Sequence, residues 1–185
     1  DDQDRLSQII FPFNEAARCN VPGILVGHVV VPTLDSETKP IPAASLSAKF
    51  LNGLLREKWG YPGVILADDV NKGAITKSMP VEQASVTALA AGNDAVLMLN
   101  SDPEKVRLVC ASIEKAASDG ELDRAKLSES KKRLDAWQQA LKTPRPGLDG
   151  PLPKLPEAET AVATDAAGPA VSSPEAPPSG AEIEY

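Results

Sequence analysis

Three short runs of aliphatic residues, without polar alternation, punctuate the first hundred residues of the chain. They cover residues 23–27, continuing into 28–31, then 63–67, and then 94–99. Continuous apolar runs of this length are typical of strands that are buried on both faces of a parallel sheet. The pattern therefore predicts three core strands.

Helical patterns lie before, between and after these runs. The predicted helices cover residues 4–19, 47–58, 80–91, 101–118 and 123–141, and the second and the last carry apolar residues at helical spacing. Asp102 stands before Pro103 as a capping residue, and Asp119 and Gly120 close that helix. Alternating strands and helices predict an α/β fold with a parallel sheet or barrel, in which ligands bind at the carboxyl ends of the strands.

The composition changes after residue 142. Residues 143–185 hold nine of the 17 prolines and seven carboxylates, with Arg145 and Lys154 as their only cations. Such a segment cannot bury enough apolar surface to offset the entropy of ordering its backbone. We therefore expect a folded unit over residues 1–142 and a disordered, acidic, Pro/Ala/Glu-rich tail over 143–185. The folded unit is too short for a complete (β/α)8 barrel, which needs about 200 to 250 residues.

Charge and composition exclude several classes of function. The chain has 19 Lys and Arg against 26 Asp and Glu, a net charge of −7, which argues against nucleic acid or an anionic membrane surface as partner. No stretch approaches the roughly 20 apolar residues of a membrane span. Cys19 and Cys110 lack the spacing of a zinc motif. The first residues have no initiator methionine and no basic or apolar region of a signal peptide, so we expect missing upstream sequence, with the cytoplasm as the default location.

Polar side chains follow each predicted strand, where such folds bind ligands. His28 follows the first strand, Asp68 and Asp69 follow the second, and residues 100–102 follow the third. A carboxylate at such a position serves as a nucleophile, a general base, a metal ligand or a helix cap. A lone histidine is more often a hydrogen-bonded structural residue than a general base.

Two other aspartates are expected to have structural roles. Asp94 begins the third predicted strand, at the opposite end from the expected ligand site, and is expected to accept hydrogen bonds from turn amides. Asp35 lies in a proline-bounded loop after the first strand, where we expect it to turn the chain. The sequence contains no glycine-rich phosphate loop and no serine or cysteine nucleophile motif.

Seven segments carry a family resemblance. They are residues 11–17, 24–29 with Pro32, 44–47, 54–56, 61–70, 73–75 and 90–97. In this order they resemble the second half of the catalytic barrel of glycoside hydrolase family 3, within its β-N-acetylhexosaminidase branch. The resemblance implies that residues 1–142 form the second half of a (β/α)8 TIM-type barrel, with about three βα units.

The same resemblance implies an activity and a site. In that family the aspartate that closes the Gly-Val-Ile strand is the nucleophile that forms a covalent glycosyl-enzyme, and it falls on Asp68. The implied activity is retaining hydrolysis of terminal β-linked N-acetylglucosamine or related β-glycosides, without a metal or an organic cofactor. His28, Asp69 and Lys72 are the expected substrate-binding residues. Lys72 departs from the family, which usually has methionine there, and an ammonium beside Asp68 favours the ionised carboxylate.

The resemblance also implies an absent half. The family's acid/base pair of His and Asp, and a Lys-His segment that holds the sugar, lie upstream of residue 1. A second interpretation is therefore a non-catalytic half-barrel that binds sugar or pairs with another chain, such as the missing N-terminal half-barrel, because a half-barrel has open strand edges. A third is a doubly wound domain whose Asp pair binds Mg²⁺, which the order of the segments disfavours.

Overall fold

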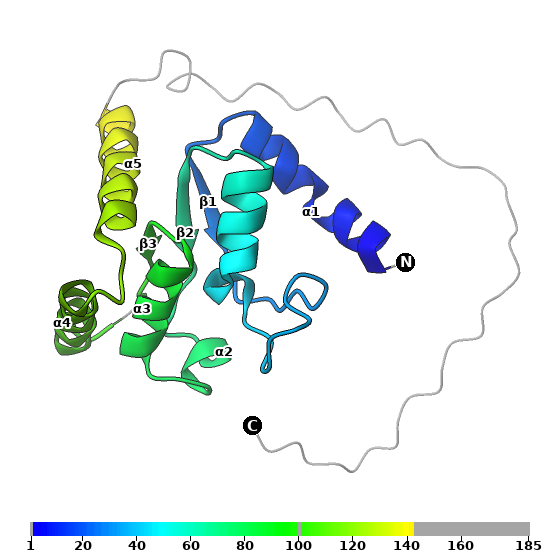
Figure 1. The fold of residues 1–185 in the computed structure, drawn as a ribbon. Coiled ribbons are helices and arrows are strands. Elements are labelled where there is room, and N and C mark those ends of the chain that lie inside the picture. Colours follow the sequence, from blue (N-terminus) through cyan, green and yellow to red (C-terminus); the bar gives the residue numbers. More distant parts are fainter. Residues whose placement is uncertain (1, 100, 143–185) are drawn as a thin grey trace, which may run out of the picture. The chain divides into compact units, whose positions relative to one another are not determined.

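The described part of the chain is built on a three-stranded parallel sheet (Figure 1). The computed structural model describes residues 2–99 and 101–142, so the predicted tail over 143–185 lies outside it. The strands are β1 (Gly23–Val26), β2 (Val64–Ala67) and β3 (Ala95–Val96), in the order β1-β2-β3. The prediction of an α/β fold with a parallel sheet is confirmed.

Helices precede, connect and follow the strands. They are α1 (Asp2–Arg18), the short 3₁₀-helix η1 (Ala44–Leu46), η2 (Lys49–Lys58), α2 (Gly73–Thr76), α3 (Val81–Ala91), α4 (Pro103–Asp119) and α5 (Arg124–Lys142). The five predicted helices are present, with ends that differ by at most two residues from the prediction. Within the described ranges, no helix has both the length and the apolar character to cross a membrane.

The ends of α4 show how local sequence sets an element. The Asp102 carboxylate accepts a hydrogen bond from the Glu104 amide at 2.8 Å, and Pro103 occupies the first turn, where its missing N–H costs no helical hydrogen bond. Gly120 ends the helix at φ +83°, a left-handed conformation that glycine adopts without strain. Both predicted helix signals are confirmed.

The helix predicted over residues 47–58 differs from the expectation in kind. η2 is a π-helix, and at its end the Trp59 amide donates to the Leu54 carbonyl, five residues back, at 3.0 Å. Ser47 lies before the helix. Its hydroxyl accepts from the Phe50 amide at 3.0 Å and donates to the Asp35 carboxylate. Asp35 thus anchors the long loop after β1 to the start of η2, more than merely turning the chain.

Two strands are shorter than their apolar runs suggest. The prediction that the first strand continues through residue 31 is wrong, because β1 ends at Val26 and Val30 forms only an isolated antiparallel bridge with Ala43. β3 covers two of the six predicted residues. The carbonyl of Leu97 accepts from the Val70 amide at 3.0 Å, so beyond β3 the chain bonds to the loop that follows β2.

Two apolar clusters hold the elements together. One lies between η2 and the strands β1 and β2; its buried members are Ala17, Ile24, Val26, Ala44, Leu51, Leu55, Tyr61, Ile65 and Ala91. The other involves α3, α4 and the residues after β2; its buried members are Ala67, Val70, Val81, Ala88 and Val109. Burial of these side chains drives the packing of the helices onto the sheet. It leaves the loops after β1 and β2 at the carboxyl ends of the strands.

A buried ion cluster at the amino ends of the strands ties three elements together. Asp94 Oδ1 accepts from Ser130 Oγ at 2.7 Å and from Arg133 Nη2 at 2.8 Å, and its Oδ2 accepts from Arg56 Nη2 at 2.6 Å and the Ile65 amide at 2.8 Å. The expected structural role of Asp94 is confirmed, but its partners are two guanidinium groups and a strand amide in place of turn amides. The cluster joins η2, β2 and α5.

Candidate active site

The candidate site lies at the carboxyl ends of β1 and β2. Asp68 directly follows the last residue of β2, and its amide donates to the Val26 carbonyl of β1 at 3.0 Å. The loop after β1 brings His28 to the backbone of Asp69. His28 and the Asp68-Asp69 pair therefore meet at one edge of the sheet, and Ser101 of the third predicted cluster is linked to this edge through Asn71, as expected for a parallel arrangement. Residue 100, of the third cluster, lies outside the described residues.

Asp68 is held as an anion by two donors. Its Oδ2 accepts from Lys72 Nζ at 2.6 Å, and its Oδ1 accepts from the Asp69 amide at 2.7 Å. The hydrogen bond from Lys72 is the largest cause that lowers the pKa of Asp68 below its usual range, and the bond from the Asp69 amide is the next. The side chain is 21% exposed. Asp68 is thus an ionised carboxylate that solvent or a ligand can reach.

Asp69 points elsewhere, although it is the neighbour of Asp68. Its carboxylate is buried, and its Oδ1 accepts from the amides of Asn71 and Leu99, each at 3.1 Å. The side chain therefore joins the loop after β2 to the segment after β3. The structure does not bring the two carboxylates together on one ligand, and substrate binding by Asp69 stays a prediction.

His28 connects two loops of the site. Its Nε2 lies 2.9 Å from the Asp69 carbonyl oxygen, and its Nδ1 lies 2.7 Å from Ser45 Oγ. A carbonyl oxygen only accepts, so we assign a proton to Nε2, and in that tautomer the Ser45 hydroxyl donates to Nδ1. Both ring nitrogens are used within the protein. This is the arrangement of a positioning residue, and contact of His28 with substrate stays a prediction.

Sequence reasoning missed Asn71 and Lys105, which also lie at this edge of the sheet. Asn71 Nδ2 donates to Ser101 Oγ at 3.0 Å, and Asn71 Oδ1 accepts from Lys105 Nζ at 2.9 Å. These bonds link the loop after β2 to the first turn of α4. A polar residue three positions after the strand-end Asp68 is the only signal in the sequence, and it does not reveal the partners, which lie about thirty residues away.

The third interpretation, a Mg²⁺ site, depends on which ligands the described residues offer at the same edge. Within residues 2–99 and 101–142, no group of three or more His, Cys, Asp and Glu side chains is placed to hold a metal ion. The third interpretation needs the carboxylates of Asp68 and Asp69 on one cation, and these two carboxylates have separate partners.

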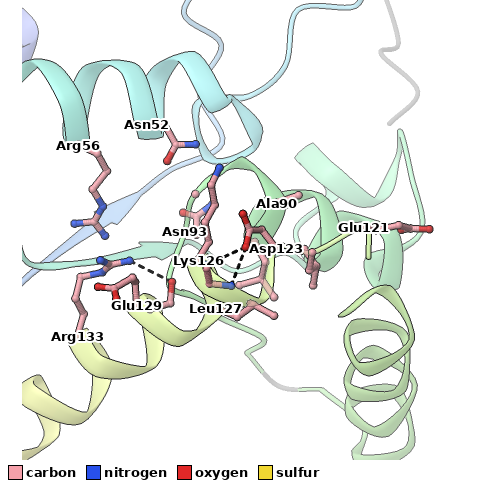
Figure 2. A pocket seen from close by; sticks show the side chains of 15 residues that line it. Asn52, Arg56, Ala90, Asn93, Glu121, Asp123, Lys126, Leu127, Glu129 and Arg133 are labelled. Carbon is pink, nitrogen blue, oxygen red and sulfur yellow. Dashed lines mark hydrogen bonds between the residues drawn. The ribbon is translucent and has the colours of Figure 1, made fainter. Parts of the chain in front are cut away.

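A cavity of about 400 Å³ lies at the opposite edge of the sheet (Figure 2). It is lined by Asn52 and Arg56 of η2, by Asn93 before β3, and by Lys126 and Arg133 of α5. Asn93 is buried, and its Oδ1 has no hydrogen-bond partner in the described part of the chain. The Asp94 cluster forms part of the wall, so the cavity belongs to the structural end of the sheet and is remote from Asp68.

Comparison with known proteins decides the family. Residues 1–136 match the model of the glycosyl hydrolase family 3 N terminal domain. The chain belongs to this family. The TIM-barrel-like α/β fold that the family resemblance implies is thereby confirmed for this family 3 chain, with the described residues supplying three parallel strands and their helices.

Curated relatives carry the name β-hexosaminidase. The family 3 chain is 29% identical over 147 residues to the protein of Chromobacterium violaceum, an alignment that covers 77% of this chain and 40% of that protein. It is 31% identical over 145 residues to the protein of Vibrio cholerae El Tor, covering 76% and 42%. The chain therefore spans about two fifths of the length of these relatives.

Solved structures agree with this assignment. A glycoside hydrolase family 3 β-N-acetylglucosaminidase from Paenibacillus sp. str. FPU-7 superposes with a TM-score of 0.66 at 29% identity, over 82% of this chain and 27% of that one. A family 3 glycosyl hydrolase of Mycobacterium smegmatis gives a TM-score of 0.59 at 29% identity, over 69% and 39%. The similarity again covers only part of each longer protein.

The contact between Lys72 and Asp68 predicts how the pKa of Asp68 changes when Lys72 is replaced. Replacing Lys72 with methionine removes the donor that most lowers the pKa of Asp68, so that pKa should rise towards about 3.9, the value of an unperturbed aspartate. Carbon-detected NMR of the Asp68 carboxyl group over acidic pH measures it. Lys77→Met, which removes an exposed lysine outside this contact, is the matched control and should leave the titration unchanged. An unshifted Asp68 in Lys72→Met would contradict the contact.

Proposed function

We propose that this chain is the part of a retaining glycoside hydrolase that carries its nucleophile, Asp68. The proposed substrates are terminal β-linked N-acetylglucosamine and related β-glycosides. The names of the relatives support the sugar, since they are β-hexosaminidases and β-N-acetylglucosaminidases. The observation that carries the proposal is an ionised, solvent-accessible carboxylate at the carboxyl end of β2, where this fold places catalytic groups.

The proposed reaction has two steps. In the first, an Asp68 oxygen attacks the anomeric carbon, the bond to the leaving oxygen breaks, and an acid protonates that oxygen. In the second, a base takes a proton from water, the water attacks the same carbon, and the Asp68 carboxylate leaves. Retaining enzymes place the acid/base group about 5 Å from the nucleophile. Neither His28 nor Asp69 is free for this role, because both are engaged within the protein.

The acid/base group and the missing half of the barrel are therefore proposed to come from upstream sequence or from another chain. The apolar surface supports this. Ile9, Phe11 and Phe13 of α1 and Leu25 of β1 are each more than half exposed, and β1 pairs with β2 alone among the described strands. Unpaired strand edges beside exposed apolar side chains mark an interface. We propose that the first half-barrel covers this surface.

The test is catalysis by the native protein at its full length, after its intact mass has been measured. Release of nitrophenol from 4-nitrophenyl N-acetyl-β-glucosaminide, with a sugar adduct on the tryptic peptide that contains Asp68, is the expected result.

The exposed apolar surface also favours the second interpretation, a non-catalytic half-barrel that binds sugar or pairs with another chain. Sugar binding by the native protein without turnover or adduct would favour that interpretation and contradict the first.

A further inference from the structure

Lys72 places a positive charge directly on the carboxylate that we propose as the nucleophile. It bonds to Asp68 Oδ2 while the Asp69 amide bonds to Oδ1, so both oxygens of Asp68 have a donor before substrate arrives. The backbone of Lys72 is fixed, because its carbonyl accepts from the Ile75 and Thr76 amides at the start of α2. Its side chain is half exposed. The ammonium is therefore placed on one oxygen of Asp68 by a backbone that is itself hydrogen-bonded to α2.

We propose that Lys72 controls the balance between the two steps of the reaction, slowing formation of the glycosyl-enzyme and speeding its breakdown. This rests on the proposed function, with Asp68 as the nucleophile. The ammonium binds a carboxylate more tightly than an ester, because the ester oxygen carries no net charge. An interaction that weakens on the way to a transition state raises that barrier, and one that strengthens lowers it.

The charge on Asp68 changes in opposite directions in the two steps. During formation the carboxylate oxygen gives an electron pair to the anomeric carbon and loses its charge, so the bond to Lys72 weakens. During breakdown water attacks that carbon, the bond from carbon to the Asp68 oxygen breaks, and the electron pair returns to the carboxylate. The bond to Lys72 is restored as this happens. Lys72 thus makes Asp68 a weaker nucleophile and a better leaving group.

A structural role for Lys72 predicts a different result. If the lysine only fastens the loop after β2 to the start of α2, its removal changes stability and affects both steps alike. The Lys72 side chain is half exposed and Asp68 is partly exposed, so the contribution of the ion pair to stability is small. The ratio of the two rate constants is the quantity that separates the two roles, because loop fastening does not reverse its effect between the steps.

The experiment measures both steps in the native protein with 2,4-dinitrophenyl N-acetyl-β-glucosaminide, whose leaving group needs no acid. Acid quenching at increasing times, followed by intact mass measurement, gives the rates at which the adduct forms and disappears. In Lys72→Met we expect formation to be faster and breakdown slower, each by about twofold, because the two changes together amount to at most the roughly fivefold that one partly exposed ion pair supplies. The adduct should accumulate. Lys72→Arg should restore most of the wild-type ratio, and Lys77→Met should leave it unchanged.

The outcomes separate the inference from the function on which it rests. An adduct on Asp68 with the same ratio of rates in the wild type and in Lys72→Met overturns the role of Lys72 and leaves the nucleophile in place. An adduct on another residue, or no adduct and no phenol release in either protein, overturns the proposed function and the inference with it.

Discussion

Asp68→Asn in the native protein is expected to reduce kcat/KM for aryl N-acetyl-β-glucosaminides by about a thousandfold or more, as removal of a covalent nucleophile does in other enzymes. The amide is nearly isosteric with the carboxylate but has no negative charge to attack the anomeric carbon. The Asp69 amide can still donate to its oxygen, while the ion pair with Lys72 is lost. Because the Lys72 side chain of that pair is half exposed, the free energy of unfolding should change little. Steady-state kinetics and urea unfolding measure the two effects.

Asp102→Asn is the matched control for this loss. Asp102 lies at the same edge of the sheet and caps α4, and asparagine caps a helix about as well as aspartate. Its removal should leave activity and stability close to wild type. A second variant identifies the role of Asp68: in Asp68→Ala, added azide should enter the space and restore turnover with an inverted glycosyl azide as product. Activity of Asp68→Asn within tenfold of wild type would rule out Asp68 as nucleophile.

Local sequence signals predicted the elements but not all of their lengths. The apolar run over residues 23–31 reads as one strand, yet the chain leaves the sheet after Val26. There the ring of His28 bonds to Ser45 and to the backbone of Asp69, and these partners lie seventeen and forty-one residues away. Contacts at such separations are fixed by the tertiary fold, which a pattern of apolar residues does not encode. The π-helical geometry of η2 was likewise not visible in its helical spacing.

The sequence predicted the position of the candidate site better than it predicted the hydrogen bonds within the site. Polar residues at the ends of apolar strands identified the Asp68-Asp69 pair and its edge of the sheet, and the family resemblance singled out Asp68 and placed Lys72 near it. What the sequence did not reveal is that the carboxylates of Asp68 and Asp69 have different hydrogen-bond partners. The structure has one carboxylate on the Lys72 ammonium and the other on loop amides. The partners of Asp69 depend on where the segment after β3 places the Leu99 amide.

Asp94→Ala is expected to cost about 3–5 kcal/mol of unfolding free energy, as breaking a buried ion cluster from one side does. The Asp94 carboxylate is fully buried, whereas the side chains of Arg56 and Arg133 are 17% and 27% exposed. Its loss leaves both guanidinium groups facing each other without an anion, and leaves the Ile65 amide without its acceptor. Removing one partner lowers the free energy of unfolding by more than the pairs contribute net, because the groups left without a partner remain desolvated.

Urea unfolding of the chain measures the loss, with the slope of the transition compared between variants to verify that the folded state is unchanged. Asp135→Ala is the matched control. It removes an exposed carboxylate that pairs with Lys131 on α5, and exposed pairs of this spacing contribute about 0.5 kcal/mol or less. Arg133→Met should fall between the two, because Arg56 and Ser130 still satisfy Asp94. An Asp94→Ala variant as stable as Asp135→Ala would mean that α5 is not held to β2 and η2 by this cluster.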